Sequence, residues 1–370
     1  MPSPALIDIE SLVGPISEDN SVGEDIRQDS SPTSLYHTIK AARSAARAAE
    51  RHSLFDGGSN EAQQNWQKIL ELAPEILKNH AKDLEVASWY TEALIRRAGF
   101  QGLRDGFTVI HQLIENYWDN IYPLPDEEDG IETRLASLTG LNGEGAEGVL
   151  IAPIRNVIIT EGSEPGPFSF WQYKQALDIQ KIADEDTRAQ RAAKIGYSLE
   201  DIENAVADSS QEFFVNLRDD VAVSINEYRE ISRVLDSLCG SHEAPPTSNI
   251  INTLEDALSV VKHVARFKLP VESSNEDDLG EQGDVASAGQ SASVLTVPGA
   301  IKTRDDAFRH LNDIASFFRK TEPHSPISYI IDKAVRWGDM ELNELMKELI
   351  PDSSSRTFYS SLTGVKTEDD

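Results

Sequence analysis

The sequence predicts a mainly α-helical chain built of several helical bundles, with at most a small β-hairpin. Three observations predict this fold class. From Leu35 to Ile350, apolar residues recur at spacings of three and four, which places them on one face of a helix. Proline and glycine interrupt these stretches where helices are expected to end. Only residues 154–160 and 167–170 have β character, and the turn-rich residues 161–166 separate them.

The helical periodicity divides the chain into a series of expected helices. The most regular stretch has a 4-3-4-3-4 rhythm and stops at two prolines, which lack the amide donor that a helix needs. Its inward positions are Leu103, Phe107, Ile110, Ile114, Tyr117 and Ile121, and the prolines are Pro123 and Pro125. The other expected helices cover residues 35–49, 61–79, 83–97, 131–138 and 211–238, a stretch that begins at Trp171, and a stretch that follows Pro245 and Pro246.

The first of these helices has a basic stripe beside its apolar face. The stripe consists of Lys40, Arg43, Arg47 and Arg51. In an acidic protein such a stripe is a candidate docking face. The alternative is a solvated face whose charges pair with nearby acids, which is the commoner occurrence.

Composition excludes several classes of function. The 370 residues contain 34 Lys and Arg against 63 Asp and Glu, a formal net charge of −29, so the chain would repel nucleic acid and anionic membranes. Cys239 stands alone, which rules out an intramolecular disulfide and a cysteine metal cluster. The first residues are acidic rather than basic, and the longest apolar run, residues 149–154, is far shorter than a membrane span. A soluble cytoplasmic protein is therefore expected.

No catalytic, cofactor-binding or metal-binding residue is predicted. The string Gly143-Glu-Gly-Ala-Glu-Gly148 fits G-x-G-x-x-G, but a helix precedes it and its acids would repel phosphate, so it is expected to be a loop. Residues 126–129 are expected to form an exposed acidic turn rather than a calcium loop. The eight histidines are scattered without ligand spacing. An enzyme that uses a carboxylate cleft is the least favoured function.

The composition along the chain also predicts its domain organisation. Residues 270–300 contain no Lys or Arg and are rich in Ser, Gly, Ala and acids, which is typical of a flexible linker. The expected order is a disordered N-terminus at 1–10, an N-terminal helical domain at 11–183, a middle helical region at 184–269, the linker at 270–300, a C-terminal helical oligomerisation domain at 301–352 and a disordered tail at 353–370.

The C-terminal domain is expected to be small. Ser325 and Pro326 predict a helix start, because serine caps the free amides and proline suits the first helical position. The inward positions of that helix are expected to be Ile327, Ile330, Ile331 and Ala334, and Gly338 is expected to end it. About 50 residues bury little core alone, so this domain would gain stability from self-association.

Several separated strings occur in an order that points to one family. They are Leu12-Val-Gly-Pro-Ile-Ser17, Gly23-Glu-Asp-Ile-Arg27, Lys82-Asp-Leu84, Trp89-Tyr-Thr-Glu-Ala-Leu94, Gly99-Phe-Gln-Gly-Leu103 and Trp118-Asp-Asn-Ile-Tyr-Pro123, followed by Arg134 and, near the C-terminus, by Thr321-Glu-Pro-His-Ser-Pro326 and Arg336-Trp-Gly338. In this order and spacing they resemble the ImpA/TssA proteins of bacterial type VI secretion systems. The resemblance covers about residues 11–160 and 303–351.

The family-motif residues carry structural expectations. They are Gly23, Glu24, Asp25, Lys82, Asp83, Trp89, Gly99, Gly102, Trp118, Pro123 and Arg134, and the residues expected at an oligomer interface are Pro326, Arg336, Trp337 and Gly338. Gly99 and Gly102 are expected to supply a positive φ or a close backbone crossing, and Trp118 to wedge two helices together. Trp337 completes either a small core or an interface.

The resemblance implies a non-enzymatic cytoplasmic assembly factor without a cofactor. Its expected partners are copies of itself in a ring and the baseplate, tube and sheath subunits of the secretion system, at the inner face of the envelope. Priming of tube and sheath polymerisation at the baseplate is favoured, because the chain is short and ends in the Arg336-Trp-Gly338 type of C-terminus. Capping of the distal end of the sheath is the alternative within the family. A generic acidic helical adaptor is the alternative outside it.

Overall fold

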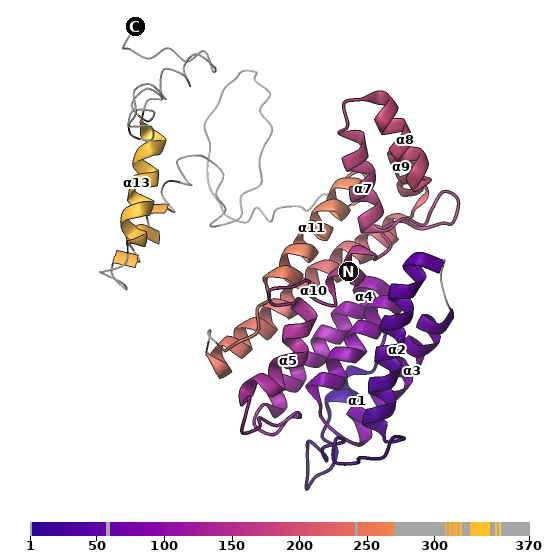
Figure 1. The fold of residues 1–370 in the computed structure, drawn as a ribbon, viewed down its shortest axis with the longest axis vertical. Coiled ribbons are helices and arrows are strands. Elements are labelled where there is room, and N and C mark those ends of the chain that lie inside the picture. Colours follow the sequence, from indigo (N-terminus) through magenta and orange to yellow (C-terminus); the bar gives the residue numbers. More distant parts are fainter. Residues whose placement is uncertain are drawn as a thin grey trace, which may run out of the picture. The chain divides into compact units, whose positions relative to one another are not determined.

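The computed structural model describes residues 2–56, 60–240, 243–269 and 326–340, together with residues 308, 311–312, 314–316, 318–319, 345 and 348. The chain divides into two compact units, Met1–Asn275 and Glu276–Asp370. The predicted mainly α fold is confirmed, since the described residues form helices and isolated β-bridges without a sheet (Figure 1). The predicted hairpin is reduced to one antiparallel bridge between Ile158 and Ser169.

The first unit contains the helices α1 to α11. In chain order they are α1 (Ile9–Val13), α2 (Leu35–Asp56), α3 (Asn60–Asn79), α4 (Leu84–Tyr117), α5 (Ile131–Asn142), α6 (Ile151–Arg155), α7 (Phe170–Gln180), α8 (Glu185–Ile195), α9 (Leu199–Asp208), α10 (Gln211–Cys239) and α11 (Ser248–Val264). In the second unit the described helix is α13 (Ile327–Asp339).

Two expected helices, 83–97 and 103–121, form the single element α4 with a break inside it. Ala98 and Gly99 leave the helical conformation, and Gly99 has φ of +57°, which glycine adopts without strain. Beyond this break the second segment folds back on the first. A Cβ on Gly102 would lie 2.2 Å from the carbonyl oxygen of Leu94, and a Cβ on Gly106 would lie 2.6 Å from the hydroxyl of Thr91. The two helical segments therefore touch backbone to backbone.

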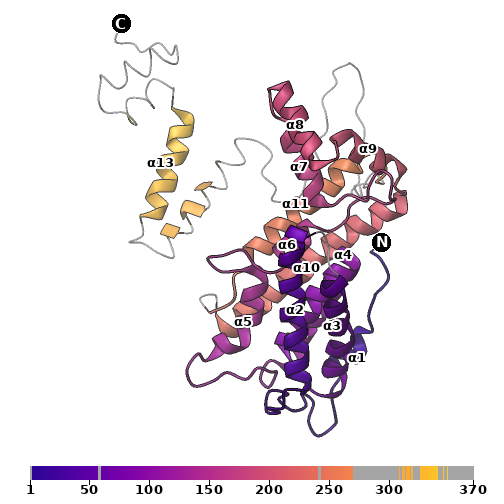
Figure 2. The ribbon, with the colours of Figure 1, turned by 45° about the vertical axis from the view of Figure 1, so that its right-hand side comes forward.

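The other long helices of the first unit pack in order around α4. Helix α3 contacts one side of α4 and α2 covers α3, while α10 contacts α4 and α11 covers α10 (Figures 1 and 2). The rings of Phe107 on α4 and Tyr228 on α10 lie 4.7 Å apart, and both are buried. The predicted boundary at residues 183 and 184 therefore does not separate compact units, because α10 buries its apolar face against α4.

The N-terminal segment corrects a second expectation. Residues 1–10 are predicted to be disordered, whereas residues 2–10 lie across α4 and α10. The backbone amide of Leu6 donates to Asp105 at 2.6 Å, and Arg104 donates to the carbonyl oxygen of Ser3 at 2.6 Å. Arg104 also pairs with Asp220 of α10 at 2.6 Å. These buried charges hold residues 2–10 in place. Composition alone does not reveal such pairing, because the partners are far apart in the sequence.

Some expectations fall on parts of the chain that the structure does not describe. The predicted linker at 270–300 and the tail at 353–370 lie outside the described residues, as does Ser325. Within the described helices, none combines the length and the apolar character needed to cross a bilayer. Cys239 is a free thiol at the end of α10.

The backbone crossing in α4 predicts that adding one methyl group at Gly102 destabilises the fold. Gly102→Ala places a Cβ on the Leu94 carbonyl, so the two segments must separate, and we expect the free energy of unfolding to fall by about 1–3 kcal/mol. The matched control is Gly140→Ala in α5, where a Cβ would meet nothing within 4 Å and where alanine is expected to stabilise the helix by about 0.5–1 kcal/mol. Urea unfolding of both variants measures the difference. Equal stability of the two variants would contradict the crossing.

Candidate functional site

The family-motif residues from three separate segments meet at the start of α4. Gly23 forms an antiparallel bridge with Ala81, and Asp83 forms a parallel bridge with Tyr122. The amide of Lys82 donates to Val22 at 2.8 Å. Gly23 has φ of +75°, and a Cβ there would lie 1.9 Å from a backbone oxygen, so only glycine fits this contact. The motifs therefore join the N-terminal loop to the two ends of the α4 hairpin.

Lys82 is the charged centre of this junction. Its side chain is fully buried, and its ammonium donates to the carbonyl oxygens of Leu12 at 2.7 Å and Leu77 at 2.6 Å. Burial lowers the pKa of Lys82 from 10.5 to about 8, because desolvation disfavours the charged form. This lysine holds the end of α1 against the end of α3.

Asp83 combines two roles beside Lys82. Its carboxylate accepts the amide of Val86 at 3.0 Å, which caps the first turn of α4, and it accepts Arg27 at 2.6 Å. Arg27 bonds Glu85 at 2.6 Å and Asp25 at 3.2 Å as well. Arg27 is thus the residue that connects the acidic motif at the N-terminus to α4. The side chain of the neighbouring motif residue Glu24 is exposed.

Arg134, Trp118 and Pro123 form the other end of the junction. The buried Arg134 donates to the carbonyl oxygen of Trp118 at 2.6 Å and to that of Pro123 at 3.1 Å. Its guanidinium lies 5.0 Å from the centre of the Trp118 ring. Burial lowers the pKa of Arg134 below its ordinary value. Trp118 therefore stacks on an arginine of α5 and fixes the turn that follows α4.

The remaining motif residues of this unit lie inside the core. Trp89 is buried and stacks on Tyr36 of α2, with ring centres 6.0 Å apart. Gly99 and Gly102 lie at the break and the crossing of α4. Within the described residues, these motif positions thus hold elements of the first unit together.

The basic stripe on α2 separates into paired and unpaired charges. Arg43 pairs with Glu92 of α4 at 2.6 Å, and Lys40 donates to the hydroxyl of Tyr36 at 3.3 Å. Arg47 and Arg51 make no ion pair with a described residue. The two interpretations of the stripe therefore apply to different halves of it: its N-terminal half is structural, and its C-terminal half offers unpaired charge.

The motif strings without an assigned role are surface loops. Gly143 and Gly145, in the G-x-G-x-x-G string between α5 and α6, have φ of +84° and +67°. Asp126 accepts the amide of Asp129 at 2.7 Å and the hydroxyl of Thr133 at 2.8 Å, and these hydrogen bonds lower its pKa. No set of three His, Cys, Asp or Glu side chains in the described part of the chain is placed to hold a metal ion.

In the second unit, the structure corrects the predicted inward face of α13. Ile327 and Ile330 are 40% and 64% exposed, and Tyr329 is also 64% exposed. A unit of this size buries only one side of each helix, so part of the apolar surface stays uncovered within one chain. Pro326 occupies the N-cap position, and Gly338 lies within the last turn.

Arg336 and Trp337, expected at an interface, lie on the last turns of α13. Arg336 is exposed and lies 3.7 Å from Glu348. Trp337 is partly buried, with the ammonium of Lys333 4.9 Å from its ring. These two residues therefore already have contacts within the unit, while Tyr329 and Ile330 before them are each 64% exposed.

Sequence reasoning missed the buried charges that join α4 to α10. Arg104 donates to Asp105 at 2.6 Å and to Asp220 at 2.6 Å, and Asp220 also accepts the amide of Ser3 at 3.0 Å. All three charged side chains are buried. Asp220 follows Arg104 by 116 residues, so no local pattern signals the pair.

The lowered pKa of Lys82 predicts a pH-dependent stability. Between about pH 8 and 10.5 the unfolded state binds one proton more than the folded state, so this group adds stability as the pH rises. Lys82→Met removes that contribution. From pH 7 to 9.5 the wild type is expected to gain about 2 kcal/mol relative to the variant.

Urea unfolding at several pH values measures the difference. Lys78→Met is the matched control, because Lys78 is exposed at the end of α3 and its replacement should shift stability equally at every pH. Parallel pH profiles of wild type and Lys82→Met would show that Lys82 titrates as a solvated lysine.

Comparison with known proteins agrees with the geometry of the first unit. Residues 13–143 match the family described as ImpA, N-terminal, type VI secretion system. The type VI secretion system component TssA1 of Pseudomonas aeruginosa is 24% identical over 370 residues, which cover 98% of this chain and 100% of the relative.

A solved structure shows the same fold. It is the N-terminal domain, including the conserved ImpA_N region, of the TssA component of the type VI secretion system from Burkholderia cenocepacia. It superposes with a TM-score of 0.58 at 24% identity and covers 72% of this chain and 98% of its own. The matched family region contains the junction of Gly23, Lys82, Asp83 and Arg134. Residues 13–143 of this chain therefore match the ImpA N-terminal family of type VI secretion, and the chain is similar over nearly its whole length to a TssA component, as its motif strings predict.

Proposed function

We propose that this chain is a non-enzymatic assembly component that acts at the baseplate of a type VI secretion system. In this role it primes or stabilises polymerisation of the tail tube and sheath, and its C-terminal unit joins copies of the chain into a ring. The observation that carries the proposal is the uncovered apolar face of α13. The similarity to TssA components supports a role in a type VI secretion system. The division into two units supports a mechanism in which one unit self-associates and the other binds partners.

The apolar side chains of the second unit support self-association. Ile330 and Tyr329 are each 64% exposed, Ile327 is 40% exposed, and Ile314 is 44% exposed. Contiguous exposed apolar surface marks sites of protein–protein contact. A second copy of the same unit covers such a face most simply, because identical chains assemble symmetrically. We therefore assign this face to contacts between copies.

A ring also explains how weak contacts suffice. Each copy brings one ImpA-type unit, so a ring presents several of them to a baseplate or growing sheath that itself repeats. Multivalent binding raises the overall affinity without a strong individual contact. The net charge of −29 supports protein partners over nucleic acid, and recruitment to the inner face of the envelope from the cytoplasm fits this role.

Capping of the distal end of the sheath is the second candidate. This role requires the same ring and the same partners, but at the distal end of the sheath instead of at the baseplate. We favour priming, because this chain aligns with TssA1 over 98% of its own residues and 100% of that relative and carries the Arg336-Trp-Gly338 string.

Substitution on α13 tests the ring. Ile330→Asp places a charge on the apolar face, and we expect self-association of the full-length chain to weaken about tenfold or more, because an aspartate buried at the contact lacks a partner. Multi-angle light scattering over a range of concentrations measures the mass. Phe267→Asp is the control, since Phe267 is 87% exposed in the first unit and should leave the mass unchanged. A wild-type chain that is monomeric at every concentration would disprove the ring.

Localisation distinguishes priming from capping. A fluorescent fusion of the full-length chain should stay at the envelope while a sheath extends away from it. Time-lapse microscopy with a second label on the sheath follows both signals. A fusion that travels with the distal tip would assign the chain to capping and overturn the priming role.

A further inference from the structure

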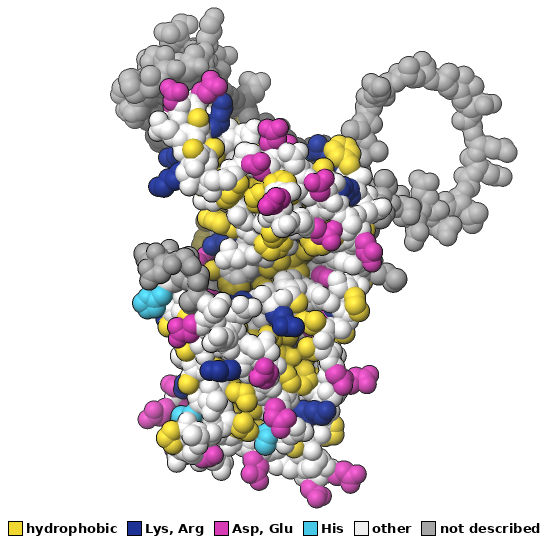
Figure 3. Space-filling model, turned by 90° about the vertical axis from the view of Figure 1, so that its right-hand side faces the viewer, with side chains coloured by type: hydrophobic (Ala, Val, Ile, Leu, Met, Phe, Trp, Pro, Cys, Tyr) yellow, Lys and Arg dark blue, Asp and Glu magenta, His cyan; other side chains and the backbone are white. Residues whose placement is uncertain are grey.

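A groove crosses the first unit at the break of α4. Its volume is about 1070 Å³, and it is lined by the C-terminal half of α2, the α4 break, residues 147–158 and the start of α10. Figure 3 shows apolar side chains gathered in a hollow across the middle of this face. The groove is long and open, which suits a protein segment better than a small molecule enclosed on all sides.

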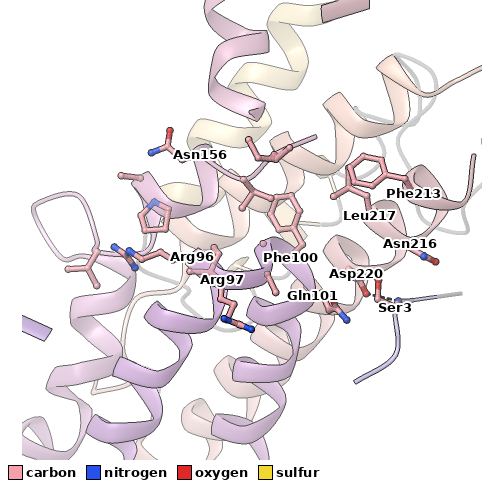
Figure 4. Close-up of a pocket in the computed structure, with 18 of the residues that line it drawn as sticks. Ser3, Arg96, Arg97, Phe100, Gln101, Asn156, Phe213, Asn216, Leu217 and Asp220 are labelled. Carbon is pink, nitrogen blue, oxygen red and sulfur yellow. Dashed lines mark hydrogen bonds between the residues drawn. The ribbon is translucent and has the colours of Figure 1, made fainter. Parts of the chain in front are cut away.

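The floor of the groove is apolar. Phe213 of α10 is partly exposed in the groove, whereas Phe100, at the centre of Figure 4, and Leu217 are buried and form the packed layer beneath it. Val157 and Ile158 line it from the segment after α6, and Ile158 is 40% exposed. An apolar floor of this kind binds the apolar face of a partner helix through residues spaced three and four apart.

One end of the groove carries unpaired positive charge. Arg47, Arg51 and Arg97 line this end, and none of them forms an ion pair with a described residue. Burial lowers the pKa of Arg47, the nearby carboxylate of Glu92 opposes this shift, and the neighbouring charges of Arg43, Arg51 and Arg96 add to it. This crowding of arginines occurs in a chain whose net charge is −29, so it contrasts with the rest of the molecule.

The arginines near the groove divide by role. Arg96 is held by Glu50 at 2.6 Å and lies 4.0 Å from the centre of the Trp66 ring, so it is part of the framework. Arg97 is its neighbour in sequence and is exposed, and Figure 4 shows both side chains at the same end of the groove. The start of α10 adds the exposed Glu212 to the lining, which also includes Glu50, Glu147 and Glu161. The groove therefore carries both positive and negative charge.

We propose that this groove binds an amphipathic helix of a partner protein, with its apolar face on Phe213 and Ile158 and its acidic N-terminal turn on Arg47, Arg51 and Arg97. Acidic residues are favoured in the first turn of a helix because they complement its dipole, so the charge of the groove also selects the direction of the bound helix. That the partner belongs to the secretion machinery rests on the proposed function. The binding itself does not depend on the ring.

Defined peptides test the groove on the full-length chain. The probe is a fluorescein-labelled synthetic helix of about 18 residues, with leucines along one face and three glutamates in its first turn. Its partner peptide has lysines in place of the glutamates. Fluorescence anisotropy should show binding of the acidic peptide and at least tenfold weaker binding of the basic one.

Three substituted chains locate the binding. The triple variant R47E/R51E/R97E should lose at least tenfold affinity for the acidic peptide and gain affinity for the basic one. The control triple variant R188E/R191E/R233E has the same net charge, at arginines distant in sequence from the groove lining, and should bind as wild type does. The single variant Ile158→Asn, at an exposed floor position, should also weaken binding several-fold.

The outcomes separate this inference from the ring. Equal binding of the two peptides, no binding to the wild type, or equal loss in both triple variants would overturn the groove. Binding that occurs only after deletion of residues 270–300 would assign the groove to this chain's own acidic segment, and the partner would be excluded. None of these results changes the light-scattering mass of the full-length chain, so a failure of the ring remains distinguishable.

Discussion

The backbone contact inside α4 is the constraint on which the first unit depends. Gly99 reverses the chain at φ of +57°, and Gly102 brings the two helical segments together without a Cβ between them. Helices α1, α3, α5, α6 and α10 then pack on the hairpin so formed. A wider crossing would displace these helices together, because close-packed interiors leave no space to absorb the change.

Buried charges set the position of the segments around this hairpin. Lys82 holds α1 and α3 through backbone oxygens, Arg134 holds the turn after α4, and Arg104 joins α4 to α10 through Asp220. Removing one partner of such a contact leaves a buried polar group unsatisfied, which costs more than the contact itself contributes. The family motifs around Lys82 and Arg134 are therefore explained by placement of elements rather than by chemistry at a reactive centre.

The elements that local patterns specify were predictable from the sequence. The 4-3-4-3-4 rhythm from Leu103 onward predicts a helix with one buried face, and Leu103, Phe107, Ile110 and Ile114 are buried in α4. Collinear motif strings identified the family, because short strings in a fixed order recur rarely by chance.

Contacts between distant segments were not predictable from one sequence. The N-terminal residues have a composition typical of disorder, yet Arg104 and Asp220 hold Ser3 in place. The domain boundary near residue 184 was wrong because periodicity shows that α10 has an apolar face and does not show that α4 covers it. On α13 the same periodicity located an apolar face, but Ile327 and Ile330 face solvent within one chain. A pattern of spacing cannot distinguish a core from an interface between copies.

Under the proposed function, the first unit binds partners through a groove that carries both charges, and the C-terminal unit joins copies of the chain. Sedimentation velocity of the full-length chain and of a chain that ends at residue 275 tests this division most directly. The full-length chain should sediment as a multimer and the shortened chain as a folded monomer. A multimer that survives the truncation would contradict the account.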